Sequence, residues 1–448
     1  MRVTVLFIAL FLLSSAWTFG QLNTIYLSNN EAASQWRGNP AFQGKEKVFL
    51  YILPAVSSFD ISAGHTGFTY NDAVQGKTVN FSSVIDGLKK KNHLLFENRI
   101  SMFALGLKAG KTQFRIGMDV ATDMRFSYPG ELIELLWKGN GHPDVIGRNL
   151  DMSGLGLNFI SYYDYFIGLS RTMMDDKLAV GANLHYMQGL ETIYTKTSEF
   201  YFYTDPNDYA LTASGAFDLK TSLYSDTTDI PDDRYFPFSN SDNTGMSFDF
   251  GATYKFSDRL DLQASALNIG SINWTTQAKS FVLDGVSITY DGLELDDIYD
   301  QSDSVETSLE NVADSIADLF ELDERAGSFK TPSNARYILS ADYALGAKNH
   351  VQFTYAHMRS FNQGFNTVVG MFRRDFSPLF SVQGGLQFFN FRHLLVPIAF
   401  QFNPGPVQLA VGTGNVVSAF GYKNMKFLSG HFSLSLRFGK QRSPRVDD

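Results

Sequence analysis

Apolar and polar residues alternate along much of the C-terminal half of the chain. Between residues 248 and 256, every second residue is Phe, Ala or Tyr, and Asp, Gly, Thr and Lys stand between them. Near the end, Phe432, Leu434, Leu436 and Phe438 alternate with Ser and Arg. Successive side chains of a strand point to opposite faces, so each such segment predicts a strand with one apolar and one polar face. This pattern indicates an all-β protein.

The alternating segments number about 14, an even count that is typical of a closed single-chain barrel. We expect the strands near residues 47–61, 99–108, 112–127, 157–173, 177–193, 245–256, 259–275, 334–346, 349–360, 364–374, 377–390, 392–402, 406–413 and 429–438. Every second connection is a short turn, and most of the others are long, at 62–98, 128–156, 194–244, 276–333 and 414–428. The sequence therefore predicts a transmembrane antiparallel β-barrel with periplasmic turns and extracellular loops.

The composition agrees with this fold class. Aromatic residues make up 15% of the chain, with 40 Phe and 21 Tyr, while the mean hydropathy is near neutral at -0.12. A membrane barrel has no strongly hydrophobic window, because lipid-facing and lumen-facing residues alternate, and its aromatic residues form girdles at the two interfaces. A soluble β-sandwich is the alternative with a similar composition, but it gives no reason for so many Phe.

The N-terminus has the features of an export signal. Arg2 precedes an apolar run from Val3 to Leu13, and the small residue Gly20 offers a cleavage site before Gln21. The run is about half of the roughly 20 residues that a spanning helix needs, so we expect a signal peptide at 1–20 rather than an uncleaved anchor. The chain has no cysteine, which excludes a disulfide scaffold and a lipoprotein attached through cysteine.

The segment 21–45 precedes the first predicted strand and contains Asn39, Pro40 and Ala41. Here the chain resembles the FadL-type family of outer-membrane barrels, whose N-terminal segment enters the lumen as a plug and carries an Asn-Pro-Ala signature. Further segments are similar to an uncharacterised FadL-like family of gliding, type IX-secreting bacteria: 53–54, 151–157, 181–190 and 268–274. The resemblance implies a lumenal plug at 21–45, a barrel at 46–440 and a C-terminal tail at 441–448.

Residues 291–324 form a strongly acidic insertion, with 13 Asp or Glu and no Lys or Arg. Apolar residues recur in it at helical spacing, which predicts an amphipathic helix in an extracellular loop. Four carboxylates near its start are candidate calcium ligands: Asp296, Asp297, Asp300 and Asp303. Their spacing matches no known calcium motif. A solvated face that repels lipopolysaccharide explains the same residues equally well.

A second helix is predicted at 131–136, directly after Pro129 and Gly130. It is rich in apolar residues, and we expect Leu132, Leu135 and the following Trp137 to dock into the mouth of the barrel. A patch that captures hydrophobic substrates and ordinary packing between loops are both compatible with this pattern.

Two prolines lie inside predicted strands. Pro54 and Pro397 each lack the backbone N–H that would donate a hydrogen bond to a carbonyl of the neighbouring strand. This bends the sheet or opens it locally. FadL-type transporters have a lateral opening in the barrel wall, and the resemblance implies that these prolines mark such an opening. A tolerated bulge is the alternative.

We find no pattern that indicates catalysis. Gly110, Lys111 and Thr112 lack the first glycine of a phosphate-binding loop and are typical of a hairpin turn. The eight His are scattered without ligand spacing, so we expect no enzyme, no metal and no cofactor.

The first functional hypothesis is an outer-membrane barrel that passes small hydrophobic molecules. The second is a non-transporting barrel that shuttles or anchors secreted surface proteins in type IX secretion or gliding, which the Tyr-rich stretch 194–209 favours. The expected surroundings are outer-membrane lipid and lipopolysaccharide, with no nucleic-acid partner.

Overall fold

The computed structural model describes residues 34–52, 57–69, 74–75, 78–79, 81–223, 237, 242–290, 323–361, 363–420 and 426–440. Several predicted features lie outside these residues: the signal peptide 1–20, Pro54, the four candidate calcium ligands Asp296, Asp297, Asp300 and Asp303, and the tail 441–448. Within the described ranges, every helix is too short or too polar to span a bilayer.

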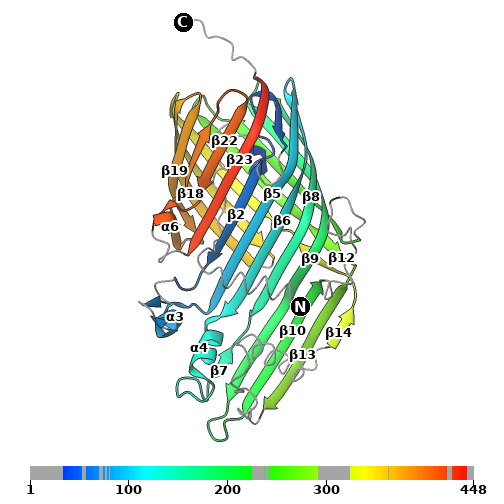
Figure 1. Cartoon of the computed structure of the whole chain (residues 1–448), viewed down its shortest axis with the longest axis vertical. Coiled ribbons are helices and arrows are strands. Elements are labelled where there is room, and N and C mark those ends of the chain that lie inside the picture. Colours follow the sequence, from blue (N-terminus) through cyan, green and yellow to red (C-terminus); the bar gives the residue numbers. More distant parts are fainter. Residues whose placement is uncertain are drawn as a thin grey trace.

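An antiparallel sheet of 14 strands closes into a barrel, as the sequence predicted (Figure 1). The sheet closes where the last strand pairs with the first, for example Val48 with Phe438 and Phe59 with Phe432. In order, the strands are β1 (Glu46–Tyr51) with β2 (Ser58–His65), β5 (Lys91–Ala109), β6 (Thr112–Pro129), β8 (Gly156–Met173), β9 (Leu178–Thr204), β11 (Thr244–Lys255), β12 (Leu260–Trp274), β16 (Arg336–Gly346), β17 (Asn349–Ser360), β18 (Gln363–Ser377), β19 (Phe380–Phe389), β20 (His393–Leu395) with β21 (Ile398–Phe402), β22 (Val407–Thr413) and β23 (Phe427–Lys440).

The wall of the barrel is apolar outside and polar inside. Along β6, the exposed side chains are Phe114 and Ile116, at 54% and 48%, whereas Gln113, Arg115 and Asp119 are buried. A soluble sandwich has the opposite distribution, because its buried face is the apolar one. The chain is therefore a membrane β-barrel, whose outward-facing apolar side chains contact lipid.

The two ends of the barrel differ. At one end, here called the turn end, consecutive strands are joined by short connections at 110–111, 174–177, 256–259, 347–348, 378–379 and 403–406. The last strand, β23, also finishes there, at the top of Figure 1. The opposite end, here called the loop end, has the long connections and the short helices α3 (Phe81–Gly87), α4 (Gly130–Lys138) and α6 (Val416–Phe420).

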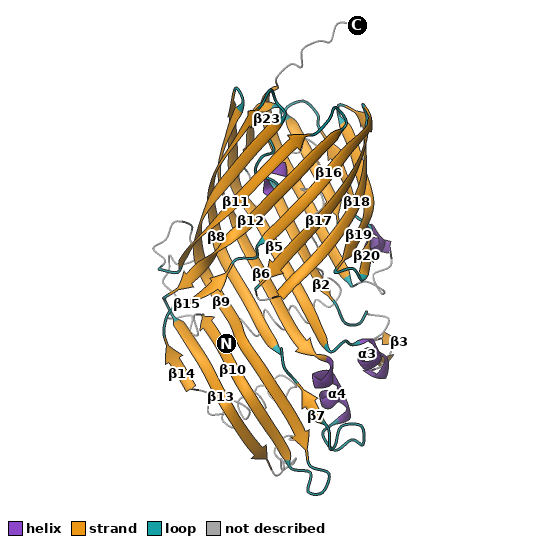
Figure 2. Cartoon of the chain, turned by 180° about the vertical axis from the view of Figure 1, so that it is seen from behind, coloured by secondary structure: helices purple, strands orange, loops and turns teal. Residues whose placement is uncertain are grey.

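The prediction of long loops at 194–244 and 276–333 is wrong for most of their described residues, because a sheet continues beyond the barrel at the loop end (Figure 2). β9 extends to Thr204 and pairs there with β10 (Leu211–Ser222), which pairs with β13 (Ala278–Tyr290). β14 (Asp323–Ala326) and β7 (Asn149–Asp151) pair with β13 and β9, respectively. These pairings satisfy backbone groups that a loop leaves to water. The Tyr-rich stretch 194–209 is therefore mostly strand.

The smaller elements complete the loop end. β15 (Phe329–Pro332) pairs with the end of β12, and β3 (Val74–Gln75) pairs with β4 (Thr78–Val79). The helix predicted after Pro129 is present as α4. Its apolar residues do not dock into the barrel mouth: Leu132 and Leu135 pack against a cluster of Val145, Leu150 and Met152, and Trp137 is exposed. The docking prediction is wrong because this cluster, at the projecting sheet, already covers the apolar residues of α4.

Candidate functional site

Residues 34–45 lie inside the barrel, in the half toward the turn end. The segment begins with a single 3-10 turn, η2 (Gln35–Arg37), and buries Trp36 against side chains of the wall. The ring of Trp36 lies 4.7 Å from that of Phe166, and Phe49 and Tyr51 complete the cluster. A bulky aromatic side chain therefore holds the beginning of this lumenal segment.

The motif Asn39-Pro40-Ala41 is bound to the wall. The Asn39 Oδ1 accepts a hydrogen bond from the Ala41 N–H at 2.9 Å, which folds the segment into a tight turn. The Asn39 Nδ2 donates to the backbone carbonyls of Ala252 on β11 and Ala264 on β12, at 3.1 and 3.2 Å. One side chain thus shapes the turn and attaches it to two strands.

Arg115 on β6 holds the backbone of the same turn. Its guanidinium donates to the carbonyl of Pro40 at 2.8 Å and to the carbonyl of Phe42 at 3.2 Å. The Ser265 hydroxyl donates to the carbonyl of Gly38 at 2.7 Å. A buried irregular segment needs partners for its carbonyl groups, and the polar inner face of the barrel supplies them.

Two glycines of the wall give the turn its space. A Cβ on Gly181 of β9 would lie 2.1 Å from the Pro40 oxygen, and one on Gly251 of β11 would lie 2.0 Å from the Asn39 Oδ1. Sequence reasoning did not single out these glycines or Arg115 as site residues. A glycine inside a regular strand is the signal that would have found them, since it often marks a close approach of another backbone.

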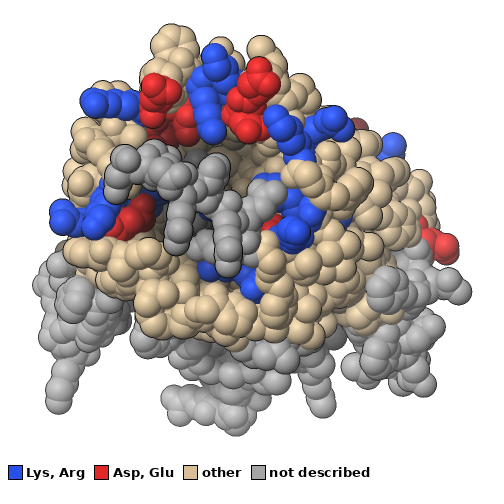
Figure 3. Space-filling model, turned by 90° about the horizontal axis from the view of Figure 1, so that it is seen from above, with Lys and Arg blue, Asp and Glu red and all other residues tan. Residues whose placement is uncertain are grey.

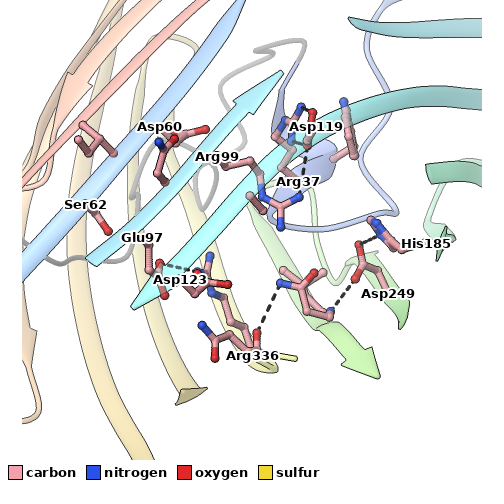
Figure 4. Close-up of a pocket in the computed structure, with 17 residues that line it drawn as sticks. Arg37, Asp60, Ser62, Glu97, Arg99, Asp119, Asp123, His185, Asp249 and Arg336 are labelled. Atoms are coloured by element: carbon pink, nitrogen blue, oxygen red, sulfur yellow. Dashed lines mark hydrogen bonds and ion pairs between the residues drawn. The ribbon is translucent and has the colours of Figure 1, made fainter. Parts of the chain in front are cut away.

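A chain of buried ion pairs begins at the lumenal segment (Figure 4). Arg37 donates to both carboxylate oxygens of Asp119, with 2.9 Å to Oδ1, and to the Ser101 hydroxyl at 3.2 Å. Arg99 pairs with the same Asp119 at 3.3 Å and with Asp164 at 2.7 Å. Asp119 is fully buried, so Arg37 of the lumenal segment compensates a charge that water does not reach.

The chain continues through a histidine. His185 lies between two carboxylates, with Nδ1 at 2.8 Å from Asp164 and Nε2 at 2.9 Å from Asp249. Ionised carboxylates only accept hydrogen bonds, so both ring nitrogens must donate, and His185 is an imidazolium. Asp249 is held in turn by Asn183 and by the backbone N–H of Asn268. The three cations Arg37, Arg99 and His185 thus balance three carboxylates.

The network borders a cavity in the middle of the lumen. Together with its open mouth the cavity has about 850 Å³ of unfilled space, and charged side chains line it from several strands (Figure 4). Beyond the network, Arg336 on β16 pairs with Glu97 on β5 at 2.6 Å, and His431 pairs with Asp60 at 2.7 Å. Seen from the turn end, Lys, Arg, Asp and Glu also surround the hollow of the barrel (Figure 3).

Toward the loop end the buried side chains become apolar. Trp274 at the end of β12 and Phe361 between β17 and β18 belong to one cluster. Phe389 at the end of β19 and Phe427 at the start of β23 belong to another. From loop end to turn end, the interior thus has an aromatic layer, then a charged layer, then the lumenal segment.

The other predicted site residues are only partly placed. Pro397 lies between β20 and β21, where the strand is interrupted, and Asn415 and Val416 hydrogen-bond the adjacent Val396 at 3.3 and 2.8 Å. Pro54 lies outside the described residues, so a wall opening at the two prolines stays a prediction, as does calcium binding at Asp296 to Asp303. Among the described residues, no three His, Asp or Glu are grouped to hold a metal.

Fold and site together define a membrane β-barrel whose N-terminal segment occupies a charged lumen. The chain belongs to a family of unknown function, DUF5723, whose model matches residues 40–414. No curated protein matches the sequence.

Solved structures with a similar course of the chain include hydrocarbon transporters. The toluene transporter TbuX of Ralstonia pickettii shares 8% identity at a TM-score of 0.44, covering 91% of this chain and 94% of its own. The toluene transporter TodX of Pseudomonas putida shares 9% at 0.40, covering 90% and 93%. A FadL homologue of Pseudomonas aeruginosa shares 11% at 0.39, also covering 90% and 93%.

Proposed function

We propose that this protein is an outer-membrane channel for small hydrophobic molecules, closed by its N-terminal segment. The observation that carries the proposal is the binding of residues 34–45 across the lumen, on the turn-end side of the aromatic layer. Arg37 and Asn39 attach this plug to the strands β6, β11 and β12. A segment held by so many groups of the wall blocks passage until it moves.

The two ends of the barrel suggest the direction of transport. In outer-membrane barrels the short turns face the periplasm, so the turn end is assigned to the periplasm and the loop end to the cell surface. Under this assignment a hydrophobic molecule meets the aromatic layer with Trp274, Phe361 and Phe427 first. Outer-membrane lipid and lipopolysaccharide would contact the apolar outer wall.

The alternative function, an anchor for secreted surface proteins, has less support. It relied on a long Tyr-rich loop at 194–209, and most of that stretch is paired strand in β9. The segment with Asn39, Pro40 and Ala41 suits both functions, and its contacts across the lumen favour the channel.

Deleting residues 22–42 tests the proposal. The barrel strands begin at Glu46, so the variant is expected to fold and to run as a heat-modifiable band, because the closed ladder resists detergent until heated. Its single-channel conductance in a planar bilayer should exceed that of the intact protein, and deletion of the tail 441–448 should leave conductance unchanged. A folded plug deletion with unchanged conductance would refute the proposed closure.

A further inference from the structure

Three segments at the loop end carry cations and no carboxylate. Residues 87–96 contain three Lys, residues 389–402 contain Arg392 and His393, and residues 414–428 contain two Lys. None of the three segments contains Asp or Glu. They belong to one side of the barrel, where β23 pairs with β2 and β2 pairs with β5. This side of the loop end is therefore cationic in sequence.

The three segments meet at one place on the edge of the barrel. The Nζ of Lys89 lies 3.4 Å from the Nε2 of His393. The ring of His393 lies 4.9 Å from the ring of Phe427, which directly follows Lys426. Arg392 directly precedes His393 in the chain. The four basic residues Lys89, Arg392, His393 and Lys426 are here called the basic rim.

The basic rim has little countercharge. Among the described residues, no carboxylate forms an ion pair with Lys89 or Arg392, whereas the neighbouring Lys90 pairs with Asp151 at 2.9 Å. Burial and the charges of Lys426 and Arg392 lower the pKa of Lys89. Like charges held close together repel one another, so an anion bound between them would stabilise the rim.

A row of aromatic rings on the outer wall leads to the basic rim. Phe126 of β6 is 36% exposed on the lipid-facing side, and Tyr128 stacks on it with 5.7 Å between the ring centres. The ring of His65 stacks on Tyr128 at 5.8 Å, and the turn after His65 contains Gly67, whose carbonyl accepts a hydrogen bond from the Nζ of Lys426. Aromatic girdles of such barrels lie at the membrane interface, which places the basic rim at the level of the lipid head groups.

We propose that the basic rim binds a phosphate group of the lipopolysaccharide in the outer leaflet. The inference goes beyond the proposed channel function and rests on the assignment of the loop end to the cell surface. A phosphate group has up to two negative charges and three strong acceptor oxygens, which suit the donors of Lys89, Arg392 and Lys426. Clusters of Lys and Arg beside membrane-spanning segments are typical binding sites for anionic head groups.

The test measures the binding of three lipids to the intact, detergent-solubilised protein by native mass spectrometry: lipid A with its phosphates, lipid A without phosphate, and phosphatidylglycerol. Phosphorylated lipid A should bind most tightly. Lys89→Gln combined with Arg392→Gln should weaken its binding about thirtyfold, because each cation beside an anionic lipid contributes about fivefold. The matched control, Lys177→Gln combined with Lys348→Gln, removes two exposed cations at the turn end and should leave the binding unchanged.

Equal binding of lipid A with and without phosphate would overturn the inference. Unchanged affinity of the variant with Lys89→Gln and Arg392→Gln, shown to be folded by its heat-modifiable mobility, would do the same. Equally tight binding of phosphatidylglycerol would refute the choice of lipopolysaccharide as the partner. None of these results touches the proposed channel function, because the conductance of the plug deletion decides it in the absence of lipopolysaccharide.

Discussion

Gly181→Ala changes the fit of the plug without touching the plug itself. The added Cβ would lie 2.1 Å from the carbonyl oxygen of Pro40, 2.4 Å from its carbon and 2.7 Å from the nitrogen of Ala41. All three are backbone atoms, so no side chain can rotate away to relieve the overlap. The lumenal turn must move away from β9.

The free-energy cost follows from two effects. Overpacking of this kind costs about 1–3 kcal/mol. A shift of the turn also lengthens the 2.8 Å bond from Arg115 to the Pro40 carbonyl, and a hydrogen bond to a charged group contributes about 1.5–3 kcal/mol. About 1.4 kcal/mol changes an equilibrium constant tenfold, so the displaced plug should be populated at least about tenfold more often.

The assay is single-channel recording in planar bilayers, where Gly181→Ala should open more often than the unmodified protein. Gly346→Ala is the matched control, because a Cβ there has nothing within 4 Å. If folded Gly181→Ala conducts no more than Gly346→Ala, the plug does not gate the lumen by its fit against β9.

Two further predictions concern the loop end. Hydrogen bonds from Ser153 and the ion pair with Lys90 lower the pKa of Asp151 to about 2. The ionised carboxylate therefore stabilises the loop beside α4 above its ordinary pKa of about 4, and this stabilisation is lost as the pH falls toward 2. Hydrogen exchange of α4, corrected for intrinsic rates, should rise between pH 4 and 2 and stay constant between pH 7 and 5. An epitope tag near Asp300 should be labelled on intact cells, since 13 carboxylates cannot enter the hydrocarbon layer; labelling only after permeabilisation would reverse the assigned sides.

The barrel was predictable because its signal is local. Period-two alternation, as in the stretch 248–256, depends only on neighbouring residues and a lipid-facing wall. The projecting sheet was missed because its signal is not local. β10 pairs with β13, where Asp218 lies opposite Val282, and both strands follow polar connections. No contact with lipid selects apolar residues for one face of this sheet, so buried and exposed positions hardly alternate along β10.

The resemblance at Asn39, Pro40 and Ala41 pointed to this lumenal segment, whose role as a plug stays a proposal, but it did not point to the wall residues that the segment contacts. Which inward side chain meets the plug depends on how the strands are staggered, and a slip of one residue turns every side chain to the other face. Arg115 and Gly181 are therefore visible as a site only when the register is known.

A reversible lock on the plug tests the central claim most directly. The chain has no cysteine, and a Cβ on Gly251 would lie 3.0 Å from the Asn39 Cγ, a spacing compatible with a disulfide. In the double variant Asn39→Cys and Gly251→Cys, openings in a planar bilayer should be rare when oxidised and return after addition of a reductant, while each single variant should not respond. Equal conductance of the oxidised and reduced double variant, with the disulfide verified by mass spectrometry, would contradict a channel that opens by moving its N-terminal plug.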